Sequence, residues 1–339
     1  MNLLEQKYRA PEIYGDHWFN SGPIILSANR GNVFLINFWD ATDQNSLRSL
    51  PYLKEWFRRY FEYGLILIGV HTPKFPFAKE PAFVQRSIFR NEIKYPIVLD
   101  NDFLVGNLFR TRLLPSSYLI DKSGFIRYIQ EGEGSYLSLE SAIQYLLADA
   151  GYRGEFPEIM KPIREEDKQS VHCYKSTPEI FVGYQRGNIG NTEGYFPQSI
   201  NDYHDPHYYL EGRVYLHGNW LVNKYFVKVE NEIPGEAYMI AQYQAKEVNV
   251  VIKPENENDF KVFVQQDGNY LSKQNAGQDV CIDEAGRSFL MIDNPKLYNV
   301  VNNAEFGEHI LKLIPDSNSF AFYSMSFVSS PITEFISGR

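Results

Sequence analysis

Cysteine is scarce in this sequence. The 339 residues include two, Cys173 and Cys281, which lie far apart in the chain. Two cysteines cannot form the disulfide framework of a small secreted domain, and neither belongs to a closely spaced pair of the kind that holds zinc. One bridge between them is the only intrachain disulfide that the sequence allows, and we expect the two residues to stay apart.

Long apolar runs and positive charge are also in short supply. No apolar run is long enough to span a bilayer, and residues 1–14 lack the apolar core of a signal peptide. We therefore expect a cytoplasmic location, with an extracytoplasmic one only if the natural chain has been trimmed. The net charge of -9 gives no electrostatic reason to expect nucleic acid or a membrane as a partner.

Motifs for cofactor chemistry are missing as well. We find no Gly-rich phosphate loop, no Ser-His-Asp arrangement and no pair of carboxylates that stands out from the background. The stretch 202–207 contains metal-ligating residue types but meets no spacing rule for a zinc site, so a polar loop is the better interpretation. The sequence therefore predicts no cofactor and no metal.

Aromatic residues, in contrast, are abundant. They make up 15% of the chain, with 24 Tyr and 24 Phe. This excess suits β-rich packing or a binding face, and it argues against disorder. Because 339 residues exceed one typical hydrophobic core, we expect two domains.

The first part of the chain alternates short buried-strand patterns with helical ones. Expected strands cover 33–38, 65–70, 97–99, 116–120 and 125–129, and expected helices cover 46–61, 81–91, 102–109 and 138–150. This alternation predicts an α/β domain over residues 1–150, with helices covering both faces of the sheet.

The second part changes character. Residues 151–178 contain Gly, Pro and a charged run, and are predicted to be a linker. Beyond them the helical pattern disappears, and the expected strands cover 212–217, 225–229, 236–243, 248–253, 261–265, 287–292, 309–313 and 321–327. Short strands at this spacing predict an all-β sandwich, jelly-roll-like, over residues 179–339.

Three segments of the first part carry a family resemblance. They are 37–53, 68–73, and the pair 95–102 with 114–121. These segments resemble the thioredoxin-like proteins of the TlpA/redoxin class, and most of all the C-terminal region of DipZ-type proteins. In that family a carbohydrate-binding-like β-module follows the thioredoxin unit, and residues 177–184 and 216–220 are similar to the opening motifs of that module.

The resemblance places Asp43-Gln44-Asn45-Ser46 where the family has its CxxC pair. A CxxC pair works because one thiolate attacks a disulfide and the second thiol releases it. Neither Asp43 nor Ser46 can perform these steps, so the frame of an oxidoreductase is present without its chemistry. Asp43 would instead cap the helix that follows; binding of a polar ligand, or service as a new acid or base, are the alternatives.

The resemblance also implies a peptide groove. Pro115 matches the family's cis-proline, and its neighbour Leu114 would offer backbone groups to an extended peptide. The residues expected to form the groove are Trp39, Asp43, Gln44, Asn45, Leu114 and Pro115. For Trp39 a place in the core is the better interpretation.

In the second domain we expect exposed aromatic rings to form any sugar-binding surface. The candidates are Trp220, Tyr203, Tyr208 and Tyr209, although aromatic residues of a β-sandwich commonly belong to its core.

Two hypotheses of function follow. The first is a redox-inactive protein that binds a peptide or protein through the groove and a carbohydrate or protein through the β-domain. The second is a thiol-disulfide oxidoreductase or redoxin-type enzyme that uses a non-standard nucleophile, Cys173 or Cys281.

Overall fold

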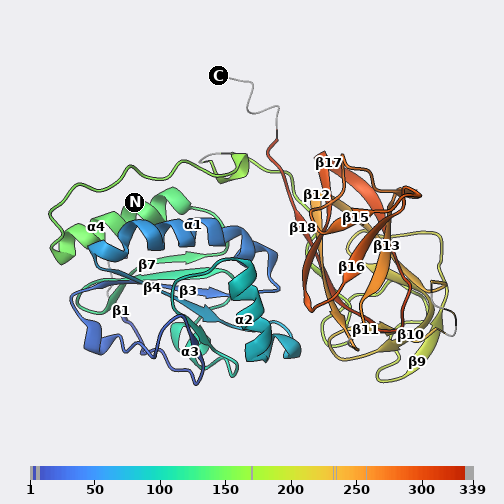
Figure 1. The fold of residues 1–339 in the computed structure, drawn as a ribbon, viewed down its shortest axis with the longest axis horizontal. Helices are drawn as coiled ribbons and strands as arrows, with labels where there is room; N and C mark the ends of the chain where they lie inside the picture. The colour runs from blue at the N-terminus through green and yellow to red at the C-terminus, as the bar shows by residue number, and fades with distance from the viewer. Residues whose placement is uncertain are drawn as a thin grey trace. The chain divides into compact units, whose positions relative to one another are not determined.

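The structure is a computed structural model, which describes residues 3–4, 8–168, 171–231, 233, 235–256 and 258–332. The chain divides into two compact units, Met1–Ser170 and Val171–Arg339. Figure 1 shows that the first unit contains helices and strands and the second contains strands. The predicted fold classes, α/β followed by all-β, are confirmed.

The first unit is built on one mixed sheet with the strand order β1-β7-β6-β3-β4-β5-β2. Its strands are β1 (Tyr8–Arg9), β2 (Trp18–Phe19), β3 (Val33–Trp39), β4 (Leu65–His71), β5 (Ile97–Leu99), β6 (Ser116–Ile120) and β7 (Phe125–Glu131). Strands β3, β4 and β5 run parallel to one another, and helices form the crossover connections that parallel strands need. Strand β6 runs antiparallel to β3, and β7 runs antiparallel to β6.

Helices cover this sheet. They are α1 (Gln44–Tyr60), α2 (Pro81–Arg90), α3 (Leu104–Phe109) and α4 (Tyr136–Ala150), and 3-10 turns occur at Ser27–Asn29, Phe61–Tyr63, Pro76–Lys79 and Glu165–Asp167. Every residue of β3 is buried, as a strand covered on both faces requires. Phe34, Ile36 and Phe38 face a core that includes Val105 and Phe109 of α3. The alternate residues, among them Asn37 and Trp39, face the other side of the sheet.

The predicted linker is only partly a spacer. Residues 157–167, which we call the strap, run back along α4 and α1, and Figure 1 shows this segment in yellow-green beside the two helices. Gln144 of α4 donates a hydrogen bond of 2.8 Å to the carbonyl of Pro157, and Arg59 of α1 donates one of 2.7 Å to the carbonyl of Glu158. The strap is thus fixed to the first unit by its own backbone groups.

The second unit is an all-β structure with long, bent strands. Its strands are β8 (Ile180–Phe181), β9 (Ile200–Tyr203), β10 (Val214–Val222), β11 (Val227–Val229), β12 (Tyr238–Pro254), β13 (Phe260–Gln266), β14 (Asn269–Tyr270), β15 (Val280–Ile282), β16 (Ser288–Ile292), β17 (Lys296–Pro315) and β18 (Phe320–Val328). The first half of β12 pairs with β10, its second half pairs with β18, and β17 runs beside it throughout.

One prediction is wrong here. Segments 236–243 and 248–253, expected as two strands, belong to the single strand β12. Irregularities in its pairing lie between Ala245 and Asn249. Odd-numbered residues up to Ala245 and even-numbered residues from Val248 onward both face the core. The irregularity shifts the alternation by one residue, so that both halves of β12 bury an apolar face.

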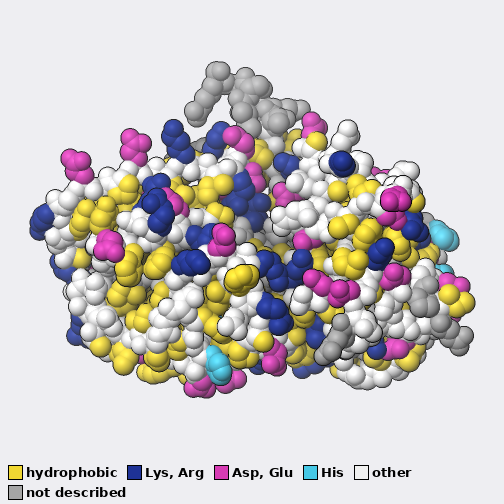
Figure 2. Space-filling view, in the orientation of Figure 1, with side chains coloured by type: hydrophobic (Ala, Val, Ile, Leu, Met, Phe, Trp, Pro, Cys, Tyr) yellow, Lys and Arg dark blue, Asp and Glu magenta, His cyan; other side chains and the backbone are white. Residues whose placement is uncertain are grey.

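No helix within the described residues is long and apolar enough to cross a membrane. On the face of the molecule shown in Figure 2, acidic and basic side chains are interspersed.

Candidate functional site

The turn between β3 and α1 holds Asp43-Gln44-Asn45-Ser46, the four residues that the resemblance places where the family has its CxxC pair. Asp43 is the N-cap of α1, with extended backbone angles (φ -98°, ψ 118°). Its Oδ1 accepts hydrogen bonds from the backbone N–H of Ser46 at 2.7 Å and from the Ser46 hydroxyl at 2.9 Å. The helix therefore begins at Gln44, two residues earlier than the sequence predicted, because Asp43 satisfies one of its free N–H groups.

The second oxygen of the Asp43 carboxylate has a cationic partner. Lys74 Nζ lies 3.0 Å from Asp43 Oδ2, and both side chains are largely buried. Lys74 comes from the segment that follows β4, and its backbone N–H donates to the carboxylate of Asp40. The sequence reasoning missed Lys74; its place three residues beyond the carboxyl end of β4, a strand adjacent to β3, is the signal that could have found it.

Two buried residues, Asp40 and His71, form hydrogen bonds with the backbone of the turn. The Asp40 carboxylate accepts from the N–H and the hydroxyl of Thr42. His71 at the end of β4 accepts a hydrogen bond from the Ala41 N–H through Nε2 at 3.3 Å. Complete burial lowers the pKa of His71, and the charge of Asp40 raises it only in part, so the imidazole stays neutral.

The proline loop lies next to the same end of the sheet. The peptide bond between Leu114 and Pro115 is cis. The Pro115 carbonyl accepts a hydrogen bond of 2.8 Å from the Gly132 N–H, whereas the backbone of Leu114 makes no hydrogen bond to any other residue that the structure describes. Leu113 beside it is 57% exposed. A segment with free backbone donors and acceptors at the surface can pair with an extended chain.

The predicted groove residues differ in access. Asn45 is exposed, Gln44 and Leu114 are half-buried, and Asp43 and Pro115 are buried at the base of the turn and of the loop. Trp39 is fully buried in the core of the unit. The prediction that Trp39 forms part of the groove is wrong, because β3 is covered on both faces and has no exposed side at this point.

A small pocket lies behind the proline loop. Its wall comes from β3, α1, β6, β7, the β7–α4 loop and α4, and consists of Asn37, Ser49, Leu53, Trp56, Pro115, Ser117, Gln130, Gly132, Glu133, Gly134, Tyr136 and Leu139. Asn37 donates a hydrogen bond of 3.0 Å to the Ser117 hydroxyl. Nothing in the sequence reasoning pointed to this pocket.

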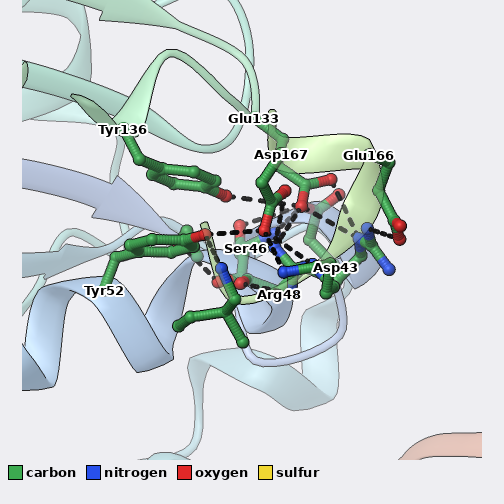
Figure 3. Close-up of polar contacts among 11 residues, drawn as sticks. Asp43, Ser46, Arg48, Tyr52, Glu133, Tyr136, Glu166 and Asp167 are labelled. Carbon is green, nitrogen blue, oxygen red and sulfur yellow. Dashed lines mark hydrogen bonds and ion pairs between the residues drawn. The ribbon is translucent and has the colours of Figure 1, made fainter. Parts of the chain in front are cut away.

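An ion-pair network borders the pocket, and Figure 3 shows Arg48 of α1 between Glu133 and Glu166. Arg48 contacts Glu133 at 2.9 Å and Glu166 at 2.8 Å, and its side chain is largely buried. Although burial lowers the pKa of Arg48, the two carboxylates raise it above its ordinary value. Arg164 of the strap approaches the same Glu133 carboxylate at 3.0 Å.

The strap is also joined to Tyr52 of α1. The Tyr52 hydroxyl donates to Asp167 at 2.7 Å and accepts from the Ile163 N–H at 2.7 Å. Its ring stacks on that of Tyr136 with centroids 3.7 Å apart. Figure 3 shows the two rings face to face. These contacts bind three separate segments, α1, the start of α4 and the strap, into one network.

In the second unit, two of the four aromatic rings predicted to bind sugar are buried. Trp220 and Tyr203 are 0% exposed and belong to the hydrophobic core, so their assignment to a binding surface was wrong. Tyr208 is 69% exposed, and Tyr209 is half-buried with its hydroxyl bonded to Asp205 at 2.9 Å. Among the described residues no group of three metal-ligating side chains converges, at positions 202–207 or elsewhere.

The two cysteines occupy different parts of the second unit. The backbone of Cys173 forms an isolated antiparallel β-bridge with that of Pro331. Cys281 lies in β15 and pairs with Phe289 of β16. Both side chains are exposed.

Comparison with known proteins identifies relatives of both units. Residues 177–327 match the family described as "Thioredoxin like C-terminal domain". Protein DipZ of Mycobacterium tuberculosis is 32% identical over 255 residues, which are 74% of this chain and 36% of DipZ. The chain thus spans about a third of the length of DipZ.

Other relatives match the first unit. The thiol-disulfide oxidoreductase YkuV of Bacillus subtilis is 26% identical over 140 residues, 41% of this chain and 94% of YkuV. A solved thioredoxin-like protein in its oxidised form is 26% identical, with a TM-score of 0.39, and covers 43% of this chain and 99% of its own. The chain is homologous to DipZ and to thiol-disulfide oxidoreductases, and it joins a thioredoxin-like α/β unit to a β-rich unit that matches the thioredoxin-like C-terminal domain.

Proposed function

We propose that this chain is a binding protein that uses a thioredoxin-like groove without thiol chemistry. The observation that carries the proposal is the state of the β3–α1 turn. The position of the attacking thiol is taken by Asp43, whose carboxylate is engaged by Ser46 and Lys74. Neither cysteine belongs to the first unit, so this unit contains no thiol to ionise, attack a disulfide or resolve one.

The groove itself supports the binding of an extended peptide. A strand-like ligand gains affinity from main-chain hydrogen bonds, and the Leu114 backbone has both a donor and an acceptor to give. Asn45 on one side and Leu113 on the other are exposed, so the groove would present a polar and an apolar wall.

The second unit would add a surface for a carbohydrate or a protein. Tyr208 supports this part of the proposal, because it is the most exposed of the candidate rings. A flat, solvent-facing ring can cover the apolar face of a sugar, or anchor a protein partner.

The relatives favour a second candidate function. YkuV is named a thiol-disulfide oxidoreductase. An enzyme of this class would have to recruit Cys173 or Cys281, both exposed, as its nucleophile. The loss of the thiol pair from the turn makes this the weaker candidate.

A peptide-binding experiment on the full chain tests the proposal. Arrayed extended peptides are screened, and the affinity of a bound peptide is measured by fluorescence anisotropy. Leu113→Glu should weaken binding at least tenfold, because it places a charge on the apolar wall. Phe89→Glu is the matched control, since Phe89 on α2 is also a large apolar residue at the surface. Failure of every peptide to bind, or equal affinity of both variants, would contradict the groove.

A further inference from the structure

The pocket behind Pro115 contains two buried polar atoms that lack partners. Asn37 and Trp56 are each 1% exposed and both line the pocket. Asn37 Oδ1 and Trp56 Nε1 have no hydrogen-bond partner among the described residues. An unsatisfied buried group costs about 1–3 kcal/mol, so native proteins keep few of them without a reason. The pocket has a volume of about 10 Å³, room for about one water, so an uncharged group that bonds to both atoms, such as an amide, would need the pocket to open.

The wall of this pocket nearest the strap is a short loop. Gly132, Glu133 and Gly134 connect β7 to α4 and line the pocket together with Pro115. Both glycines have left-handed backbone angles, with φ of 79° and 106°. Glycine adopts such angles at no steric cost, so Glu133 sits between two positions that can change their backbone conformation easily.

The Glu133 side chain is held from two directions. Arg48 Nε donates to both of its oxygens, at 2.9 and 3.1 Å, and Arg164 Nη2 donates to Oε1 at 3.0 Å. Arg164 is itself braced by Asp167 at 3.2 Å and by the carbonyl of Arg48 at 3.0 Å. All four side chains of this network are at least four-fifths buried, so solvent screens their charges less than those of a surface pair.

We propose that the strap is a latch: through Arg164 it holds the Glu133 loop against the pocket, keeps the pocket at the size of about one water, and so controls the access of larger neutral ligands to Asn37 and Trp56. The strap is the last described part of the first unit before Val171, where the second unit begins. A pull on the strap from that side would break the contacts of Asp167 and Glu166 with α1 and then that of Arg164 with Glu133, which frees the loop. The proposal does not depend on peptide binding at the groove.

A thiol placed in the pocket reports its opening. Ser49 lines the pocket and is buried, and Ser49→Cys adds a reactive atom of nearly the same size. In a chain with Cys173→Ser and Cys281→Ser, the rate of reaction with methyl methanethiosulfonate is followed by mass spectrometry. Adding Arg164→Gln should raise this rate about tenfold or more. Tenfold corresponds to about 1.4 kcal/mol in the opening equilibrium, close to the lower end of the range for one charged hydrogen bond.

Two further variants keep the test decisive. Asp167→Asn removes the brace of Arg164 without touching Glu133, and should raise the rate in the same direction. Arg58→Gln breaks an exposed ion pair with Glu55 on the same helix α1 and should leave the rate unchanged. The latch is refuted if Arg164→Gln and Asp167→Asn react no faster than the parent, or if Arg58→Gln reacts as fast as they do, which would indicate general loosening of the unit.

Discussion

The Lys74 ammonium lies 3.0 Å from the carboxylate of Asp43, at the amino end of α1. The family resemblance places an attacking thiol at this position. The positive end of a helix stabilises a thiolate in an active thioredoxin, and it stabilises a carboxylate equally well. In this chain the helix end and Lys74 both interact with the Asp43 carboxylate at this position.

The first prediction concerns this pair. Asp43→Ala should lower the free energy of unfolding by about 0.5–2 kcal/mol through loss of the N-cap, and Asp43→Ser should cost less because serine also caps. A double-mutant cycle with Lys74→Met should reveal a coupling energy of about 0.5–3 kcal/mol, measured by urea unfolding. Strictly additive effects would mean that Lys74 and Asp43 do not stabilise each other.

The second prediction is that the wild-type chain does not catalyse disulfide reduction. Insulin precipitation in the presence of dithiothreitol should proceed at the rate of dithiothreitol alone, because the turn has no thiol. If the rate rises above this background and falls again in Cys173→Ser or Cys281→Ser, the oxidoreductase hypothesis replaces ours.

The sequence predicts the backbone elements of the site better than the side-chain contacts within it. The strand β3 follows from a local apolar pattern, because burial acts over a few positions, whereas the cap at Asp43 and the proline loop were implied by the family resemblance. Lys74 was missed because its partner Asp43 is brought near it by the parallel pairing of β3 and β4, which no local pattern specifies.

Two other differences have the same origin. The strap has the Pro and charge content of a linker, but its backbone groups find partners on α1 and α4, which only the folded unit supplies. The predicted strands 236–243 and 248–253 leave residues 244–247 between them, yet these residues lie on the irregular part of β12 and continue the strand.

The third prediction restores the missing chemistry. Asp43 and Ser46 are the N-cap and the third residue of α1, and their side-chain oxygens lie 2.9 Å apart. Asp43→Cys with Ser46→Cys should therefore form a disulfide on mild oxidation. Thiol titration of the denatured variant should count four thiols when reduced and two when oxidised, because Cys173 and Cys281 remain. The single variant Asp43→Cys is the control and should keep all three thiols.

The fourth prediction uses the buried histidine under the turn. Burial lowers the pKa of His71 below its ordinary value of 6.5, whereas in the unfolded chain the residue titrates near that value. As the pH falls below about 6.5, His71 binds a proton in the unfolded state but stays unprotonated in the folded state. The free energy of unfolding therefore decreases as the pH falls.

Between pH 7.5 and 5.5 the wild-type chain should therefore lose stability more steeply than His71→Gln. The difference in slope should approach, but not exceed, about 1.4 kcal/mol per pH unit, the value for one proton. Slopes are compared because the loss of the Ala41 hydrogen bond changes the absolute stability of the variant at every pH. Urea unfolding at several pH values measures both. Parallel curves would show that His71 titrates alike in the folded and unfolded chain, and hence that it is not held neutral beneath the turn.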